Sequence, residues 1–398
     1  MTRILLYGAT GFSGTLIARE AARQLREDEL SCDFVLGGRD RFALARLSDA
    51  LGLPHIVFAL DDRPRVESVL SGFNVIVNAA GPFVATGGRL AKSAIATGCH
   101  YVDISGEVDV YQALDDLGRI GSQRQVALVS GGGFTSTVSD VLLDWALTAL
   151  ESTEYAADPP DAIRIAVTPP ADFSRGSVAT MLRSVREEVL TVRQGAFVHV
   201  PVGRHDRAFD FGPASSATHG AAERRIASAA NLLDTLTAFH TASRHGLATV
   251  GSIESFADVP RPVRLAYQLG AVSAAFFQTP LVQRAANMQI AQLAAGPDQP
   301  EREATRQTLV LQIDSACADP LVDWRIETPN CYEVTARCAV AIGEALGERG
   351  QDIAGWQTPA AVLQLESPVA GLQRGGTVSL DGPLTGSALE RRPTGSRR

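Results

Sequence analysis

A chain of 398 residues is longer than one typical domain, and its 45% hydrophobic and 20% charged residues are typical of a globular protein. The formal net charge of -8 argues against nucleic acid as the main partner. No charged, apolar leader is visible at the N-terminus, and the five cysteines form neither a CxxC pair nor a zinc spacing. We therefore expect a cytoplasmic protein with reduced thiols and no metal site.

The first predicted elements are a strand, a glycine turn and a helix. Residues 4–7 form a short apolar run typical of a buried strand, and apolar residues recur at helical spacing over 16–25. A dinucleotide-binding turn has this context, because its backbone N–H groups face a pyrophosphate at the helix start. The pattern is GxxGxxG rather than GxGxxG, so an ordinary turn is the alternative. The predicted cofactor contacts here are Gly8, Thr10, Gly11, Phe12, Ser13 and Gly14.

The second predicted strand, 34–38, ends where adenosine ribose recognition belongs in such a domain. An acid at this tip would favour NAD, but the first side chain after Gly38 is Arg39. A guanidinium fits a 2′-phosphate, so Gly38 and Arg39 predict NADP. The alternative is that Arg39 is a solvated loop charge and that Asp40 caps the next helix.

Two further strands are predicted over 55–58 and 74–78. Asp61 follows the first of them, and small residues follow the second, leaving room for a ligand at the carboxyl end of the sheet. A plain Gly-Pro turn is the alternative for the second. The predicted cofactor contacts are Asp61, Ala79, Ala80, Gly81, Pro82 and Phe83.

The next predicted helix, 87–97, carries Lys92, the only lysine of the chain. The Tyr-x-x-x-Lys pair of short-chain dehydrogenases is absent, which excludes that class.

A cluster of ionisable and hydroxyl side chains surrounds the end of a predicted strand over 101–104. Tyr101, Asp103, Ser105 and Glu107 are the candidate catalytic residues, because carboxylates at such a strand end orient a substrate or relay a proton. The alternative is that Ser105 caps a helix starting near residue 108, with Glu107 in its first turn. A last strand of this half is predicted over 125–130.

The second half predicts a helix over 138–150, a strand over 163–167, a mostly helical stretch over 174–192 and an antiparallel pair over 307–315 and 321–327. Residues 265–282 carry no charge. They predict either a core or dimer-interface helix, or an apolar lid or lipid-contacting surface, but not a membrane span.

The predicted fold class is α/β, with a Rossmann-type parallel sheet domain and a second α+β domain built on a mostly antiparallel sheet. We expect an NADP-binding domain over 1–137 and a substrate or dimerisation domain over 138–330. Helices at 331–347 and 358–365, within 331–366, are expected to return to the Rossmann domain, and a disordered tail is expected over 383–398.

Taken together, these motifs resemble the saccharopine dehydrogenase-like oxidoreductase family, and within it the branch containing trans-acting enoyl reductases. The matching segments are 7–14, 37–40, 78–83, 100–107, 132–140, 328–332 and 358–361. The resemblance implies an NADP-type Rossmann domain, a reductase activity and substrate contacts at Phe134, Thr135 and Ser136. Thr135 stands where the branch carries an acid, and Val138 where it carries a proline.

These observations predict an NADPH-dependent reductase that transfers a hydride to a polarised C=C bond of a small molecule, an acyl, lipid or secondary-metabolite intermediate. The alternatives are a saccharopine-like reductase of C=N bonds and a non-catalytic NADP-binding or lipid-associated module. A homodimer and peripheral lipid contact are further expectations, with no transmembrane segment.

Overall fold

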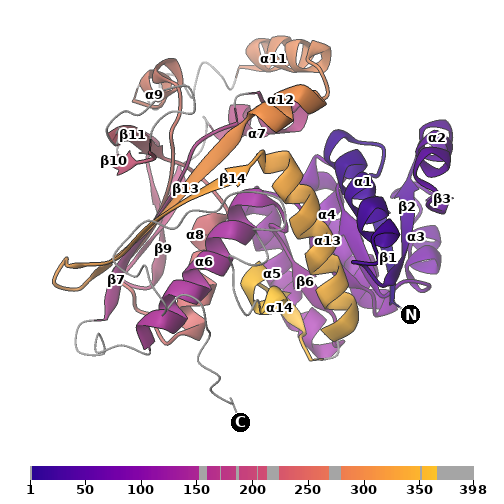
Figure 1. Cartoon of the computed structure of the whole chain (residues 1–398), viewed down its shortest axis with the longest axis horizontal. Coiled ribbons are helices and arrows are strands. Elements are labelled where there is room, and N and C mark those ends of the chain that lie inside the picture. Colours follow the sequence, from indigo (N-terminus) through magenta and orange to yellow (C-terminus); the bar gives the residue numbers. More distant parts are fainter. Residues whose placement is uncertain are drawn as a thin grey trace. The chain divides into compact units, whose positions relative to one another are not determined.

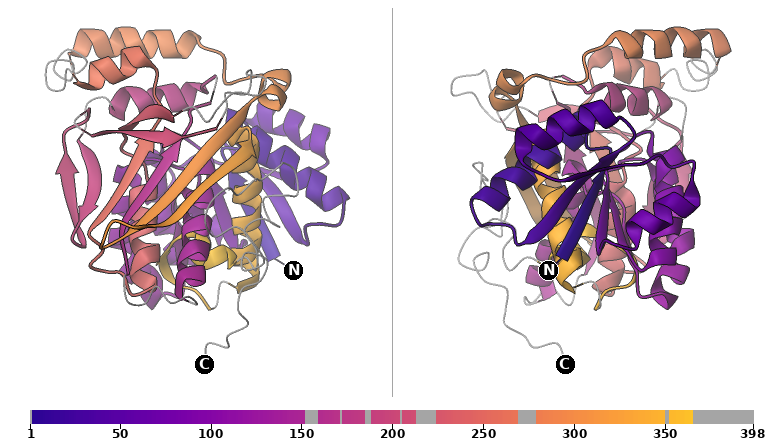
Figure 2. Two further views of the ribbon diagram at one scale, coloured as in Figure 1. Left: turned by 60° about the vertical axis from the view of Figure 1, so that its left-hand side comes forward. Right: turned by 90° about the vertical axis from the view of Figure 1, so that its right-hand side faces the viewer.

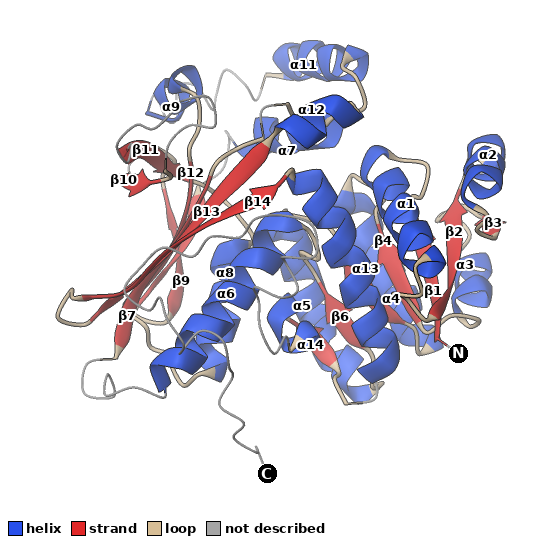
Figure 3. Ribbon diagram, in the orientation of Figure 1, coloured by secondary structure: helices blue, strands red, loops and turns tan. Residues whose placement is uncertain are grey.

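The computed structural model describes residues 2–151, 159–170, 172–184, 188–203, 205–212, 224–268, 279–349 and 352–364 (Figures 1 and 3). The predicted tail over 383–398 lies outside these residues. The chain divides into two compact units. Unit 1 comprises Met1–Thr137 and Tyr332–Gln364, and unit 2 comprises Val138–Cys331 and Leu365–Arg398.

Unit 1 is built on a seven-stranded parallel sheet in the order β15-β6-β5-β4-β1-β2-β3. The order reverses at β1, as in doubly wound dinucleotide-binding folds, which confirms the predicted Rossmann-type sheet. The strands are β1 (Thr2–Tyr7), β2 (Cys32–Gly38), β3 (His55–Val57), β4 (Val75–Asn78), β5 (His100–Asp103), β6 (Ala127–Val129) and β15 (Gly355–Gln357).

Helices pack on both faces of this sheet, because strands buried on both sides need two apolar covers. One cover consists of α3, α4 and α5, whose buried residues form one cluster with Leu5, Ile76 and Leu128. On the other face α13 comes close to the sheet, where Gly343 faces Ile4 and Val77. The helices are α1 (Phe12–Arg26), α2 (Arg41–Leu51), α3 (Arg63–Leu70), α4 (Phe83–Thr97), α5 (Val108–Gln123), α13 (Cys331–Arg349) and α14 (Pro359–Leu363).

The edge strand β15 is a correction to the sequence prediction, which placed only helices in 331–366. Residues Gly355–Gln357 pair in parallel with β6. The Trp356 ring packs edge-on against Tyr111, and its Nε1–H donates to Ser130 Oγ at 3.0 Å. Three residues are too few to show a strand periodicity, so the sequence pattern gave no signal.

Unit 2 contains an eight-stranded mixed sheet in which β7 and β12 are the parallel pair and the other recorded pairings are antiparallel. The predicted mostly antiparallel sheet is confirmed, including the hairpin of β13 and β14. The strands are β7 (Pro160–Val167), β8 (Val189–Arg193), β9 (Ala196–Val200), β10 (Asp206–Asp210), β11 (Arg224–Ala229), β12 (Ser252–Ala257), β13 (Arg306–Ser315) and β14 (Pro320–Pro329).

Helices α6 and α8 pack against this sheet. Trp145 of α6 packs against Trp324 of β14, with ring centroids 6.1 Å apart, and Thr235 of α8 shares a hydroxyl hydrogen bond with Ser255 of β12. The helices are α6 (Phe134–Glu151), α7 (Arg175–Ser184), α8 (Asp234–Arg244), α9 (Arg261–Gln268), α11 (Pro280–Gln292) and α12 (Gln299–Ala304). Figure 2 shows α11 and α9 at one end of unit 2.

One predicted helical stretch of this half needs correction. The stretch over 174–192 contains α7 and then the strand β8, whose Val189 and Val192 are both fully buried. A fully buried strand and a buried helical turn have the same apolar composition, so periodicity could not separate them. The uncharged stretch over 265–282 includes the end of α9 and the start of α11, while 269–278 lie outside the described residues.

Candidate cofactor and active site

The glycine turn after β1 brings backbone atoms closer together than side chains would allow. Gly8 has a φ of +85°, and a Cβ there would lie 2.7 Å from the amide nitrogen of Ala80. A Cβ on Gly14 would lie 2.1 Å from the carbonyl oxygen of Gly8. The turn therefore requires glycine at both positions, and it holds two of the predicted cofactor segments, 8–14 and 79–80, in contact.

Helix α1 begins directly at this turn, with Gly11 as its N-cap. Gly11 provides no side-chain cap, and the first turn carries no acidic residue. The positive end of the helix dipole is thus not neutralised from within the helix, as an anion site requires. Phe12 is half-buried, and its ring packs edge-on against Tyr332 of α13.

The tip of β2 carries an exposed Arg39 followed by Asp40. Asp40 caps α2, because its Oδ1 accepts the N–H groups of Phe42 and Ala43 at 3.1 and 3.0 Å. The capping alternative from the sequence is therefore correct for Asp40, and Arg39 remains solvent-accessible. Burial raises the pKa of Tyr7, Arg39 opposes the shift and Asp61 adds to it. The charges of Arg39 and Asp61 therefore both affect the Tyr7 hydroxyl group at the end of β1, although the two residues follow different strands.

The loop after β4 is fixed by Asn78, a fully buried residue that the sequence analysis did not single out. Its Oδ1 accepts the Ala80 N–H at 3.0 Å, and its Nδ2 donates to Tyr101 Oη at 3.1 Å. Thr86 Oγ1 accepts from the same Nδ2 and donates to the Ala80 carbonyl at 2.6 Å. An amide at the end of an apolar strand is the signal that could have identified Asn78.

Asp103 is a fully buried carboxyl group at the end of β5. Tyr101 Oη donates to its Oδ2 at 2.8 Å, while the Ser105 and Gly131 N–H groups donate to its Oδ1 at 2.9 and 3.4 Å. Burial raises the pKa of Asp103 to about 6, although these hydrogen bonds lower it, and the nearby Glu107 adds to the rise. Asp103 therefore titrates much closer to neutrality than an exposed aspartate.

The four catalytic candidates differ in their access to solvent. Tyr101 and Asp103 are 0% exposed, and Ser105 is 2% exposed. Glu107 is half-buried, and it is the N-cap of α5 rather than a first-turn residue. Ser105 Oγ accepts the Glu107 N–H at 3.0 Å, so Ser105 holds the residue at the helix start instead of capping the helix itself.

The predicted substrate contacts Phe134, Thr135 and Ser136 lie in the first turn of α6, not in a loop. Phe134 and Ser136 are buried, and Thr135 is half-buried. The Phe134 N–H donates to Thr335 Oγ1 of α13 at 3.0 Å. The predicted helix over 87–97 likewise begins earlier, at Phe83, so the loop after β4 ends at Pro82.

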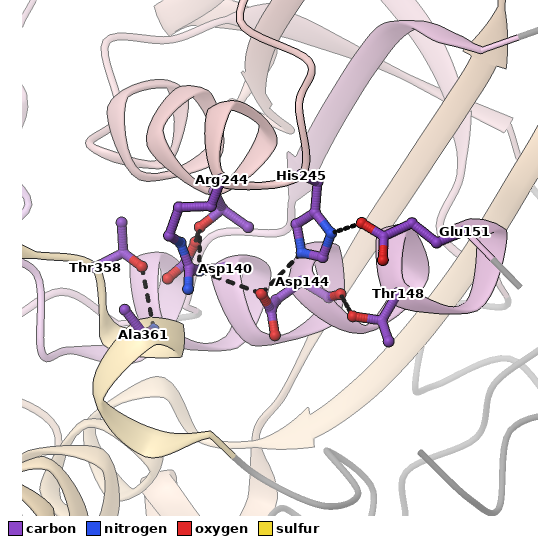
Figure 4. Close-up of polar contacts among 9 residues, drawn as sticks. Asp140, Asp144, Thr148, Glu151, Arg244, His245, Thr358 and Ala361 are labelled. Atoms are coloured by element: carbon purple, nitrogen blue, oxygen red, sulfur yellow. Dashed lines mark hydrogen bonds and ion pairs between the residues drawn. The ribbon is translucent and has the colours of Figure 1, made fainter. Parts of the chain in front are cut away.

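A second polar cluster, within unit 2, was not predicted from the sequence (Figure 4). His245 Nε2 lies 3.0 Å from Asp144 Oδ1, and its Nδ1 lies 2.6 Å from Glu151 Oε1. Arg244 also contacts Asp144, at 3.2 Å. Burial lowers the pKa of His245, but the hydrogen bonds to the two carboxylates outweigh it, so the pKa is raised. The cluster joins α6 to the end of α8.

Over the described ranges, no group of three or more His, Cys, Asp or Glu residues is arranged to hold a metal ion. The helices of the same ranges include none with the length and hydropathy needed to cross a bilayer.

A doubly wound parallel sheet whose first strand leads into a glycine turn and an uncapped helix start defines a dinucleotide-binding domain. Residues 4–128 match the family described as saccharopine dehydrogenase NADP binding domain. Residues 4–128 are thus similar to the NADP-binding domain of that family, which confirms the predicted cofactor class.

Relatives named as reductases or oxidoreductases align with a part of the chain. A trans-acting enoyl reductase of Mycobacterium ulcerans is 30% identical over 152 residues, which are 35% of this chain and 34% of the relative. A saccharopine dehydrogenase-like oxidoreductase of Homo sapiens is 25% identical over 170 residues, 37% of this chain and 40% of the relative. The aligned segments thus span less than half of either relative.

The fold as a whole resembles that of a solved saccharopine dehydrogenase. The apo, histidine-tagged, L-Glu-forming saccharopine dehydrogenase of Saccharomyces cerevisiae superposes with a TM-score of 0.58. The alignment covers 96% of this chain and 99% of that chain at 12% sequence identity. At this identity the likeness establishes a shared fold.

Proposed function

We propose that the protein is an NADPH-dependent reductase of a polarised C=C bond in an acyl or related small molecule. The observation that carries this proposal is the contact between the Gly8 turn and the Ala79–Ala80 backbone, inside a domain of the NADP-binding family. The C=C specificity draws on the trans-acting enoyl reductase named among the relatives.

The cofactor-binding roles follow from the backbone geometry. The N–H groups of the turn around Gly11 and the start of α1 would hold the diphosphate, and Arg39 would hold the 2′-phosphate. The loop from Ala79 to Pro82 would lie beside the nicotinamide ribose, because Asn78 and Thr86 fix its backbone. When bound, NADPH supplies the hydride, and the chain supplies orientation and the proton.

Glu107 is the candidate proton donor that the geometry favours, because it alone of the four retains appreciable exposure. Tyr101 and Asp103 are buried and act as positioning residues. Their hydrogen bonds connect Asn78, which holds the cofactor loop, with Ser105, which holds Glu107. In this scheme the Asp103 carboxyl group fixes both ends of the site without touching the substrate.

The test is oxidation of NADPH by the purified full chain, followed by absorbance of the reduced nicotinamide. We expect turnover with α,β-unsaturated thioesters and little with cyclic imines. Preferred turnover of the imines would replace the C=C assignment with C=N reduction. NADPH binding without turnover of either class would favour a non-catalytic module.

Glu107→Gln is expected to reduce turnover at least about tenfold with little change in NADPH affinity, since a positioned proton donor contributes roughly that or more. Asp109→Asn, an exposed acid in the first turn of the same helix, is the matched control. Equal turnover of the two variants would remove Glu107 from the mechanism.

The remaining expectations belong to the same proposal. Phe134, Thr135 and Ser136 would contribute to substrate binding mainly through Thr135, the most exposed of the three. A cytoplasmic location, a homodimer and a peripheral contact with lipid complete the proposal.

A further inference from the structure

The end of unit 2 formed by α9 and α11 exposes large apolar side chains. Leu265 is 51% exposed on α9, while Leu281 and Met288 are 81% and 66% exposed on α11. Leu293, directly after α11, is 43% exposed. Each of these exposures is well beyond what a core position shows.

The exposed side of α11 is a continuous face and not a scatter of positions. Leu281, Arg284, Ala285 and Met288 are all exposed, at the i, i+3, i+4 and i+7 spacing of one helix face. Ile290, which falls off this face, is buried. Helix α11 thus carries apolar residues on both sides, with Ile290 buried on one side and Leu281 and Met288 directed to solvent on the other.

The charged residues in this stretch of the sequence all have one sign. From residue 259 to residue 297 the sequence contains three arginines, Arg261, Arg264 and Arg284, and neither Asp nor Glu. This run stands in a chain whose net charge is -8. Arg175 of α7 adds a fourth guanidinium, since its Nη2 donates to the Leu293 carbonyl at 2.7 Å.

Contacts with the rest of unit 2 hold this surface in place. Arg264 Nη1 donates to the Ile226 carbonyl at 2.7 Å, which puts another 48% exposed hydrophobic residue beside α9. Gln268 Nε2 donates to Asp206 Oδ2 at 3.2 Å, which places one carboxylate beside the end of α9. In all views α9 and α11 lie at the same end of unit 2 (Figures 1 and 2).

We propose that this α9–α11 surface, defined by Arg261, Leu265, Leu281, Arg284, Met288 and Leu293, docks on the surface of a bilayer that contains anionic phospholipids. Leucine and methionine side chains enter the acyl boundary of such a bilayer while guanidinium groups meet the phosphates. A second copy of the chain fits this surface poorly, because a two-fold interface would bring the arginines of both copies together. This docking deepens the peripheral lipid contact of the proposed function and does not depend on the reductase activity.

The experiment is flotation of the full chain with vesicles of phosphatidylcholine, with and without phosphatidylglycerol. We expect binding to the anionic vesicles that weakens as salt is added, because counterions screen the arginines. Arg261→Gln with Arg284→Gln should weaken that binding by about fivefold per arginine. Leu281→Gln with Met288→Gln should weaken it at least about tenfold.

Arg119→Gln with Ile120→Gln on α5 is the matched control, since both side chains are exposed and far along the chain from this surface. The control should bind like the parent protein, and every variant should keep the circular dichroism spectrum and the NADPH affinity of the parent. Absence of vesicle binding, or equal binding by all variants, would overturn the proposal. So would self-association that Leu281→Gln with Met288→Gln abolishes while no vesicle binding is seen, since the surface would then be a protein interface.

Discussion

We expect Arg39 to be the side chain that decides the choice between the two dinucleotides. It is exposed at the tip of β2, and its neighbour Asp40 is occupied as the cap of α2. We expect Arg39→Ala to weaken NADPH binding at least about tenfold and to leave NADH binding unchanged, because only NADPH carries the 2′-phosphate. Calorimetry with both cofactors measures this, with Arg46→Ala on α2 as an exposed control. An unchanged preference would assign the 2′-phosphate contact to another residue.

For two glycines of unit 1 we expect opposite effects of the same substitution on stability. Gly14→Ala places a methyl group 2.1 Å from the Gly8 carbonyl oxygen, so we expect a loss of about 2 to 4 kcal/mol of stability and of NADPH binding. Gly88→Ala in α4 meets nothing within 4 Å and should be neutral or stabilising by up to about 1 kcal/mol. Chemical denaturation of both variants tests the turn geometry. Equal effects would mean that the turn relaxes to accept a side chain.

His245 couples the stability of unit 2 to pH. Its pKa is raised above 6.5 in the folded state, because Asp144 and Glu151 outweigh the effect of burial. Folding therefore gains stability from His245 below pH 6.5 and loses that gain as pH rises through the folded-state pKa. His245→Gln should lower the thermal midpoint more at about pH 6 than at about pH 8.5. A pH-independent difference would show that the imidazole acts by packing alone.

At the scale of elements, β15 completes the edge of the parallel sheet with very few residues. Gly118 and Gly121 of α5 approach it so closely that a Cβ on Gly118 would lie 3.1 Å from Trp356 and one on Gly121 would lie 3.4 Å from the Cα of Gly355. Trp356 is the large apolar side chain of this strand, and its ring packs against Tyr111.

We expect Trp356→Ala to destabilise unit 1 by about 3 kcal/mol, and Trp356→Phe by less, because the ring contact is partly retained. Denaturation followed by circular dichroism gives both values. A loss of less than about 1 kcal/mol would mean that β15 is held mainly by its backbone pairing with β6.

Local signals were enough to predict the glycine turn, the alternation of strands and helices in unit 1 and the β13–β14 hairpin, since each is encoded within a few neighbouring residues. The network of Asn78, Tyr101 and Asp103 was not predictable, because it depends on strand register. Asn78 pairs with Asp103 across β4 and β5, and the two-residue period places Tyr101 on the same face as Asp103. Burial then separates Tyr101 and Asp103 from Glu107, although a sequence shows all three as polar residues at one strand end.

For the whole molecule, the division into two units allows a test of how far cofactor binding stabilises the backbone. The predicted cofactor contacts all belong to unit 1, so saturating NADPH should slow hydrogen exchange in the 8–14 and 79–83 backbone. Strands β7 and β13 of unit 2 should exchange at unchanged rates. Comparable protection of β7 and β13 would show that cofactor binding is coupled across both units.

The sheet of unit 1 is assembled from two distant pieces of chain: Trp356 meets Ser130 across 226 positions. During translation, residues 2–137 therefore leave the ribosome with the β6 edge unpaired, and the Val138–Cys331 part of unit 2 is synthesised before β15 arrives. The nascent protein must carry an open strand edge throughout that interval, which is when an edge is most exposed to wrong pairing. Ribosome-bound chains ending before and after residue 357 should accordingly differ in protease resistance over the first unit.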